Sequence, residues 1–337
     1  MYSRILLIFT GVLVLISCKQ DIPGRYIAET DTIFSKDIQD VSAKINKDPF
    51  NADLYYKRGN AFFYQKMLND AIIDFETAVK LDSNNAIYHF RLGETFLMQD
   101  SANPIKTMFH LQRATILKKD FLEAEFTLAK LYLYRQNYDK AIKAFEKLEN
   151  QEDYADKAIF YKGMSYKEQK DTLRAMQHFE KVLQINPQHY DAVMQIASLY
   201  AARGNELALQ YYNRALAINE ASDEACYGKG YFYQKNGDYE KAMAMYDKAR
   251  LINSAHKLAL YNSAFIALAQ GKFEKCRDLC NTAITMDENN ANAYALRGTA
   301  YEKMGNKKAA LQDYNAALAI DPKNLPARTG KEILSGE

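Results

Sequence analysis

Apolar residues recur every three or four positions along nearly the whole chain after residue 50, which is the spacing of amphipathic helices. The stretches NAFFYQKMLNDAIIDFETAVKLD (60–82), YFYQKNGDYEKAMAMYDKARLIN (231–253) and TAYEKMGNKKAALQDYNAALAID (299–321) share one layout. Each holds the end of one helix, a short polar turn, and a second helix with regularly placed alanines. A motif that returns at a fixed interval is typical of repeat proteins. The pattern predicts an all-α solenoid of helix-turn-helix repeats.

The interval divides the chain into eight repeats, most of them 34 residues long. They span 52–85, 86–121, 122–155, 156–189, 190–222, 223–256, 257–290 and 291–324. One position late in each first helix is always small: Gly59, Gly93, Ala129, Gly163, Ala197, Gly230, Ala264 and Gly298. Two positions of the second helix are also small, with exceptions only at Leu148 and Val182. Helices approach closely where side chains are small, so we expect the paired helices to cross at these positions.

The ends of the elements are marked as well. Gly204, Gly237, Gly271 and Gly305 stand where first helices must end, and glycine is the usual residue at a helix C-terminus. Residues 35–51 have the spacing of a lone second helix, which predicts an N-terminal capping helix. Residues 325–337 offer only a stub of helix, which predicts a short C-terminal cap. Solenoids need such caps for solubility.

These columns of small residues resemble the tetratricopeptide repeat (TPR) family, and the resemblance covers residues 52–324. It implies a right-handed solenoid of about eight TPR helix-turn-helix repeats. It also implies a concave groove, lined mainly by the first helices, that binds a protein or peptide partner. Fold alone does not define a role, so this function is an analogy with the family.

The groove positions of the family match one residue in most repeats of this chain. They fall on Tyr56, Phe90, Phe126, Phe160, Met194, Tyr227 and Tyr261. One helical turn later, Tyr231 and Phe265 are aromatic where the resemblance does not lead us to expect a ring. Repeats six and seven are therefore the better candidate for a partner-binding site. The alternative is that these rings only pack between repeats, because aromatic side chains do both.

Some members of the family grip a partner's terminal carboxylate with a set of Lys, Asn and Arg residues. Asn60 matches one asparagine of that set, but the lysine position beside it holds Tyr56. Arg91 occupies the asparagine position of the second repeat, and Glu123 and Thr127 occupy basic positions of the third. We therefore expect no such clamp here.

The first eighteen residues follow the order of a secretory signal: Arg4, an apolar run over 5–16, and the small residue Ser17 before Cys18. Twelve helical residues rise only about 18 Å, too little for a hydrocarbon core of about 30 Å. Residues 15–18 resemble the lipobox of bacterial lipoproteins, which implies removal of 1–17 and lipid attachment at Cys18. Residues 18–34 would then tether the folded part. A plain signal peptide, or an uncleaved hydrophobic start, is the alternative.

The lipobox resemblance implies a membrane-anchored lipoprotein outside the cytoplasm. Lys19 is not the aspartate that some bacteria use for retention in the inner membrane, which favours the outer membrane. The expected function is a noncatalytic protein-binding scaffold of the bacterial cell envelope. The alternative is an accessory lipoprotein of an envelope secretion or polysaccharide-export assembly.

The remaining composition offers little chemistry. A net charge of +2 gives no long-range field for nucleic acid, so we expect no nucleic-acid partner. The five histidines are scattered without a ligand spacing, and we expect no metal and no cofactor. Gly228 and Gly230 form a GxG inside a helix, without the strand that nucleotide binding requires. Cys226, Cys276 and Cys280 are expected to pack as small apolar groups. No catalytic motif is present, and an enzyme is not expected.

Overall fold

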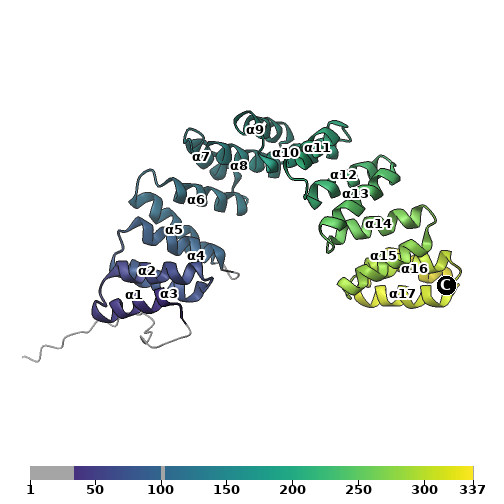
Figure 1. Cartoon of the computed structure of the whole chain (residues 1–337), viewed down its shortest axis with the longest axis horizontal. Coiled ribbons are helices and arrows are strands. Elements are labelled where there is room, and N and C mark those ends of the chain that lie inside the picture. Colours follow the sequence, from purple (N-terminus) through teal and green to yellow (C-terminus); the bar gives the residue numbers. More distant parts are fainter. Residues whose placement is uncertain (1–33, 100–102, 337) are drawn as a thin grey trace, which may run out of the picture. The chain divides into compact units, whose positions relative to one another are not determined.

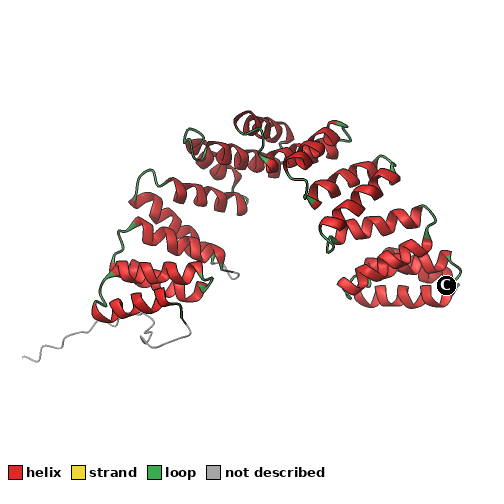
Figure 2. Cartoon of the chain, in the orientation of Figure 1, coloured by secondary structure: helices red, strands yellow, loops and turns green. Residues whose placement is uncertain are grey.

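The computed structural model describes residues 34–99 and 103–336, and every regular element in those ranges is an α-helix (Figures 1 and 2). The chain divides into two compact bodies, Met1–Lys140 and Ala141–Glu337. Each is a solenoid segment in which successive helices pack against one another. The signal and tether predicted for 1–33, with Cys18, lie outside the described residues.

Both bodies are built from helices of similar length. The N-terminal body holds α1 (Lys36–Lys47), α2 (Ala52–Tyr64), α3 (Leu68–Leu81), α4 (Ala86–Met98), α5 (Pro104–Leu117), α6 (Leu122–Tyr134) and the start of α7 (Tyr138–Leu148). The C-terminal body holds the rest of α7, then α8 (Ala155–Glu168), α9 (Thr172–Ile185), α10 (Tyr190–Ala202), α11 (Leu207–Ile218), α12 (Asp223–Lys235), α13 (Tyr239–Ile252), α14 (Lys257–Ala269), α15 (Phe273–Met286), α16 (Ala291–Lys303), α17 (Lys307–Ile320) and α18 (Leu325–Ser335). Each expected repeat therefore contains two helices.

The two helices of a repeat meet where the small residue of the first faces a large side chain of the second. A Cβ atom added to Gly163 would lie 2.8 Å from Phe179 Cε1, and one added to Gly59 would lie 2.7 Å from Phe75 Cε1. The side chains at this second-helix position are buried throughout: Phe75, Leu111, Phe145, Phe179, Tyr212, Tyr246, Cys280 and Tyr314. Six of these eight side chains are aromatic rings. Burying a large side chain such as Phe or Leu contributes about 1.5–3 kcal/mol, so these contacts form the centre of each repeat except repeat seven, which holds the smaller Cys280.

The turn after the first helix requires a left-handed residue. Gly204, Gly237, Gly271 and Gly305 have φ angles between 67° and 79°. Lys66, Gln136 and Lys170 adopt nearly the same angle, 59° to 65°, at the corresponding position of repeats one, three and four. At Lys170 the turn is closed by two backbone bonds, from Lys170 N to Lys167 O (2.9 Å) and from Asp171 N to Tyr166 O (2.9 Å). The closing bonds hold the conformation even where the residue is not glycine.

The terminal helices cover the ends of the array in different ways. Ile38 of α1 is fully buried, and the Phe34 ring packs edge-on against Phe62, with the ring centres 5.8 Å apart. At the other end α18 has 11 residues, longer than the predicted stub. It packs through its small residues Ala327 and Gly330 and the partly buried Leu334, while Leu325 and Ile333 are exposed.

No helix within 34–99 or 103–336 combines the length and the apolar character needed to span a bilayer.

The close contact at Gly163 yields a first prediction. Gly163→Leu should lower the free energy of unfolding by about 3 kcal/mol or more, because its side chain would overlap Phe179 and the Cβ atom of His178. Thermal denaturation followed by circular dichroism measures the change. Glu168→Leu, at an exposed position of the same helix, is the control and should leave the melting temperature nearly unchanged. An unchanged curve for Gly163→Leu would refute the assigned contact.

The left-handed turn residues yield a second prediction. Lys170→Gly should stabilise the protein by about 0.5–1 kcal/mol. A left-handed backbone costs a non-glycine residue roughly 1–2 kcal/mol, and glycine avoids this cost. Part of the gain is offset because glycine loses more conformational entropy on folding than lysine does. Gly237→Ala, the reverse change at the same position of repeat six, should destabilise it. Chemical denaturation of the two variants should show midpoint shifts of opposite sign, and shifts of the same sign would contradict this account.

Candidate functional site

Four aromatic side chains lie on the first helices of repeats six and seven, and we call them the aromatic surface. Tyr227 and Tyr231 are one turn apart on α12, and Tyr261 and Phe265 occupy the corresponding positions of α14. Tyr231 and Phe265 are 43% and 42% exposed, whereas Tyr227 and Tyr261 are half-buried. Tyr231 and Phe265 are therefore accessible to a partner, and the other two support them.

Tyr227 is held by contacts from three neighbouring segments. Its ring stacks on that of Tyr231, with the ring centres 6.3 Å apart, and lies 4.9 Å from the ring of His256. It also contacts the ring of Tyr246 of α13 at 5.7 Å. Asn262 of α14 donates from Nδ2 to the hydroxyl of Tyr227 (3.4 Å) and to that of Tyr246 (3.2 Å). These contacts fix the relative positions of α12, α13 and α14 beneath the aromatic surface.

The centre of this arrangement is the buried ring of Tyr246. Gly230 makes room for it, since a Cβ atom there would lie 2.8 Å from Tyr246 Cε1. Its hydroxyl donates to Gln234 Oε1 at 2.6 Å. Burial raises the pKa of Tyr246, and it also raises the pKa of Tyr227 although the bond from Asn262 opposes the shift. Both phenols are therefore neutral at physiological pH, and the aromatic surface presents uncharged rings.

Tyr261 and Phe265 have different surroundings. Tyr261 packs against a buried cluster that includes Cys276, Leu279 and Cys280, and burial raises the pKa of its phenol. Phe265 stands outside that cluster, between the buried Ala264 and Ile266 on the helix. Tyr261 thus anchors α14, while Phe265 presents its ring.

Two of the predicted partner-binding residues, Phe90 and Phe160, are buried in the structure. Phe90 is 2% exposed, with its ring centre 5.1 Å from that of Phe121. Phe160 is 9% exposed and stacks on His189 at 5.1 Å. In both repeats a ring from the connection to the next repeat covers the groove position. Neither side chain can reach a partner without displacing that ring.

The two other predicted residues are half-buried and stand apart from the aromatic surface in sequence. The ring of Tyr56 lies 5.1 Å from that of Tyr88. Lys130 places its Nζ atom 5.8 Å above the ring of Phe126. Both are less exposed than Tyr231, which is 43% exposed, so both present less surface to a partner.

Sequence analysis did not identify Asn262 or His256 as part of the candidate site. The bonding partners of Asn262 lie 35 and 16 residues away in the chain. A single asparagine inside an apolar helix gives no local signal of such a role. Only its place beside the tyrosine position of repeat seven could have suggested it.

The structure also brings together a histidine pair that the spacing did not predict. The Nδ1 atoms of His89 and His110 lie 2.9 Å apart between α4 and α5. Burial lowers the pKa of His89, and burial together with His89 and Lys106 lowers the pKa of His110 to about 4. Both rings are neutral near pH 7, so one donates to the other.

Ligand groups for a metal are not assembled in this part of the chain. The described residues hold no group of three or more His, Cys, Asp or Glu side chains placed to bind a metal ion. Cys226, Cys276 and Cys280 are buried and unpaired by disulfides. The histidine pair therefore has no third ligand among the residues described.

Comparison with protein families agrees with the repeat geometry. Models described as tetratricopeptide repeats match residues 59–100, 123–152 and 291–324. A model described as the TT21 fifth ARM repeats domain matches residues 158–268. The chain contains tetratricopeptide repeats. The TPR match at 291–324 coincides with the eighth repeat of the sequence analysis.

Solved structures share this TPR fold at low sequence identity. The C-terminal part of a TPR repeat-containing protein from Cytophaga hutchinsonii is 19% identical, with a TM-score of 0.57, and the match covers 73% of this chain and 99% of that one. A TPR protein from Parabacteroides merdae is 17% identical with a TM-score of 0.52, covering 74% and 98%. PilW, described as a widely conserved type IV pilus biogenesis factor, is 19% identical with a TM-score of 0.53, covering 63% and 99%. At these identities the likeness concerns the fold alone.

A curated TPR relative is the Hsp70-Hsp90 organising protein of Plasmodium falciparum. It is 24% identical over 111 residues, which is 31% of this chain and 20% of that protein. The chain thus spans about a fifth of the length of this relative.

Proposed function

We propose that this TPR protein is a noncatalytic scaffold that binds an extended segment of a partner protein on the aromatic surface. One observation carries the proposal. Tyr231 and Phe265 are each more than two-fifths exposed while the rings beside them are fixed from below. Rigid, accessible aromatic side chains are the residues that most often dominate binding energy at protein interfaces.

The chemistry of the aromatic surface indicates what kind of segment fits it. Tyr227 and Tyr261 are neutral, so the surface has no fixed charge of its own among its four rings. Offset stacking and apolar contact are the interactions that such rings provide, together with a hydrogen bond from the Tyr231 hydroxyl. A segment with apolar or aromatic side chains one helical turn or two strand residues apart would match them.

Recognition of a carboxyl-terminal tail by the clamp of other family members is not part of this proposal. Arg91 is already engaged: its Nη1 atom pairs with Glu94 Oε2 at 2.7 Å and its Nη2 atom donates to the Tyr64 hydroxyl at 2.9 Å. The guanidinium also lies over the ring of Phe63. A carboxylate would have to displace these contacts to bind there.

We further propose that the scaffold works beside a membrane, held by lipid at Cys18. The support is the order of residues 1–18 in the sequence. The stretch from Lys19 to Thr30 spans at most about 40 Å when extended. The TPR repeats would therefore stay near the membrane surface, with the outer membrane of the cell envelope as the proposed location.

The aromatic surface yields a third prediction. A photo-crosslinking amino acid at Leu258, exposed at the start of α14, should capture the partner from gently solubilised membranes. With that partner, Tyr231→Ala combined with Phe265→Ala should weaken binding by about 30-fold or more, since loss of one anchoring ring costs about 2 kcal/mol. The melting temperature should change little.

Tyr134→Ala is the control, because this tyrosine is 83% exposed and lies on α6. It should bind as the wild type does. If the double variant melts at a markedly lower temperature while its folded fraction binds normally, the two rings serve packing and the proposal fails.

The anchor yields a fourth prediction. In a bacterial host, the wild type should incorporate an alkyne-labelled fatty acid, and Cys18→Ser should not and should remain as a longer precursor. Membrane fractionation and intact mass report both effects, because stable anchoring needs acyl chains that the variant lacks. Cys226→Ser, which changes a buried thiol, should still be labelled. Equal partition of wild type and Cys18→Ser into the soluble fraction would exclude the anchor.

A further inference from the structure

Long cationic side chains connect neighbouring repeats at one recurring position of the first helix. In the C-terminal body, Lys162 Nζ lies 2.6 Å from Glu149 Oε1 of the preceding repeat. Lys229 donates to Asn213 Oδ1 at 2.7 Å, and Arg297 donates to Asn281 Oδ1 at 2.7 Å. Lys229 and Arg297 thus reach from a first helix to the second helix of the repeat before, and Lys162 reaches the residue that follows α7.

Repeats five and seven have no cation at this position: repeat five holds the apolar Ile196 and repeat seven holds Ser263. Ser263 stands 34 residues after Lys229 and 34 before Arg297, so it occupies the position of the cation. It is fully buried, and its Oγ atom has no hydrogen-bond partner among the described residues. Asp247 of α13 is the residue that such a cation would meet, because it stands 34 residues from both Asn213 and Asn281. Instead, Asp247 Oδ1 pairs with Arg250 Nη1 of its own helix at 3.1 Å.

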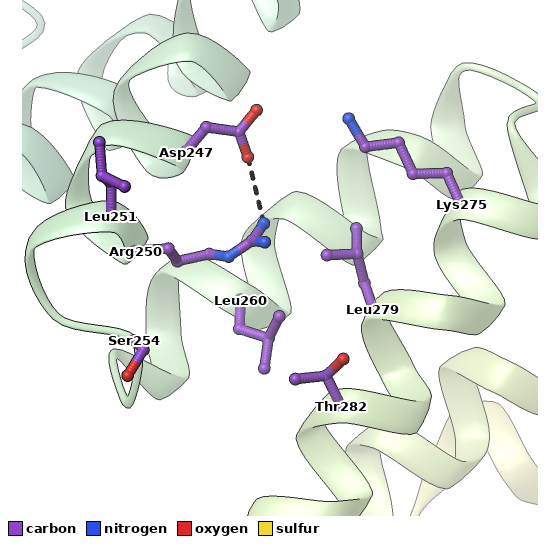
Figure 3. Close-up of a pocket in the computed structure, with 8 residues that line it drawn as sticks. All are labelled: Asp247, Arg250, Leu251, Ser254, Leu260, Lys275, Leu279 and Thr282. Atoms are coloured by element: carbon purple, nitrogen blue, oxygen red, sulfur yellow. Dashed lines mark hydrogen bonds and ion pairs between the residues drawn. The ribbon is translucent and has the colours of Figure 1, made fainter.

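A cavity of about 600 Å³ lies between α13 and α15, and Asp247, the expected partner of such a cation, is one of its lining residues (Figure 3). Leu260 of α14 and Leu279 of α15 form its apolar floor and are almost fully buried. Leu251 at the edge is 86% exposed. Figure 3 shows Arg250 and Lys275 extending from opposite sides of this space. None of the four rings of the aromatic surface lines it.

The charges around the cavity favour a negatively charged ligand. Asp247 is neutralised by Arg250, and Lys275 is exposed and forms no ion pair within the part of the chain that the structure describes. The rim therefore has one uncompensated positive charge above an apolar floor. A carboxylate next to a bulky apolar group complements both features.

The geometry points to a second docking site at this cavity, which binds an acidic peptide segment through an apolar side chain flanked by a carboxylate. The apolar side chain lies on Leu260 and Leu279, the buried residues of the cavity floor. The carboxylate binds Lys275. The site lies between second helices, so it can be occupied together with the aromatic surface on the first helices.

Two synthetic peptides test the site on the full chain. The acidic probe is acetyl-Gly-Phe-Asp-Asp-Gly-amide, and its matched counterpart carries Lys-Lys in place of Asp-Asp. Methyl NMR resonances of Leu260 and Leu279 report binding at the cavity. The acidic probe should bind at least about tenfold more tightly than the basic one, and replacement of its Phe by Ala should abolish binding.

Three variants make the test specific. Ser263→Arg restores the side chain found at this position in repeat eight, so it should fold, pair with Asp247, fill the cavity and abolish binding. Lys275→Glu changes an exposed residue and should reverse the preference between the probes. Tyr231→Ala with Phe265→Ala should leave probe binding unchanged, which separates this site from the aromatic surface.

Several results would overturn the proposal. Tighter binding of the basic probe would mean that Asp247 recognises a cation from a partner. The site would be excluded if the two probes bind equally or if neither binds. It would also be excluded if Lys275→Glu binds the acidic probe as tightly as the wild type does. The measurement on Lys275→Glu remains decisive even if Ser263→Arg does not fold.

Discussion

The close approach of two helices within each repeat is the contact on which the remaining structure depends. The helices can approach because glycine has no side chain: Gly163 and Gly230 leave room for the rings of Phe179 and Tyr246. The ring fills the space between the helices and loses almost all contact with solvent. With the helix pair fixed at this point, the rest of the first helix has a fixed orientation, and its next turns must face the groove.

The same central position links packing to the candidate site. In repeat six the central ring is a tyrosine, whose hydroxyl bonds to Gln234 and receives a bond from Asn262. Asn262 also bonds to Tyr227, the base of the aromatic surface. The position of Tyr231 is therefore set through a chain of contacts that begins at Gly230. In repeat seven, Cys280 takes the place of the ring, so this repeat has a smaller buried centre.

Whether a contact could be predicted from the sequence depends on how far apart its residues lie in the chain. The repeat boundaries rest on small residues that recur at one interval, and that signal is visible when stretches of the sequence are compared with one another. The exposure of a groove ring has no such signal. Phe160 and Tyr227 share one position and each packs against a histidine that directly precedes the next repeat, yet Phe160 is buried and Tyr227 is half-buried beneath an exposed Tyr231. Lys170 likewise adopts a glycine-like φ because its turn is closed by backbone bonds, which side-chain identity does not reveal.

The first and last repeats share a device that the inner repeats lack. Arg58 forms two bonds with Asp74, at 2.7 and 2.8 Å, and Arg297 forms two with Asp313, at 2.8 and 2.7 Å. Buried ion pairs add little net stability, but an unpaired buried charge is strongly destabilising. Any shift of one helix along its neighbour would separate such a pair. The terminal repeats have a TPR neighbour on one side only. The forked ion pairs therefore oppose sliding of one helix along the other at these ends, where apolar packing alone would oppose it less.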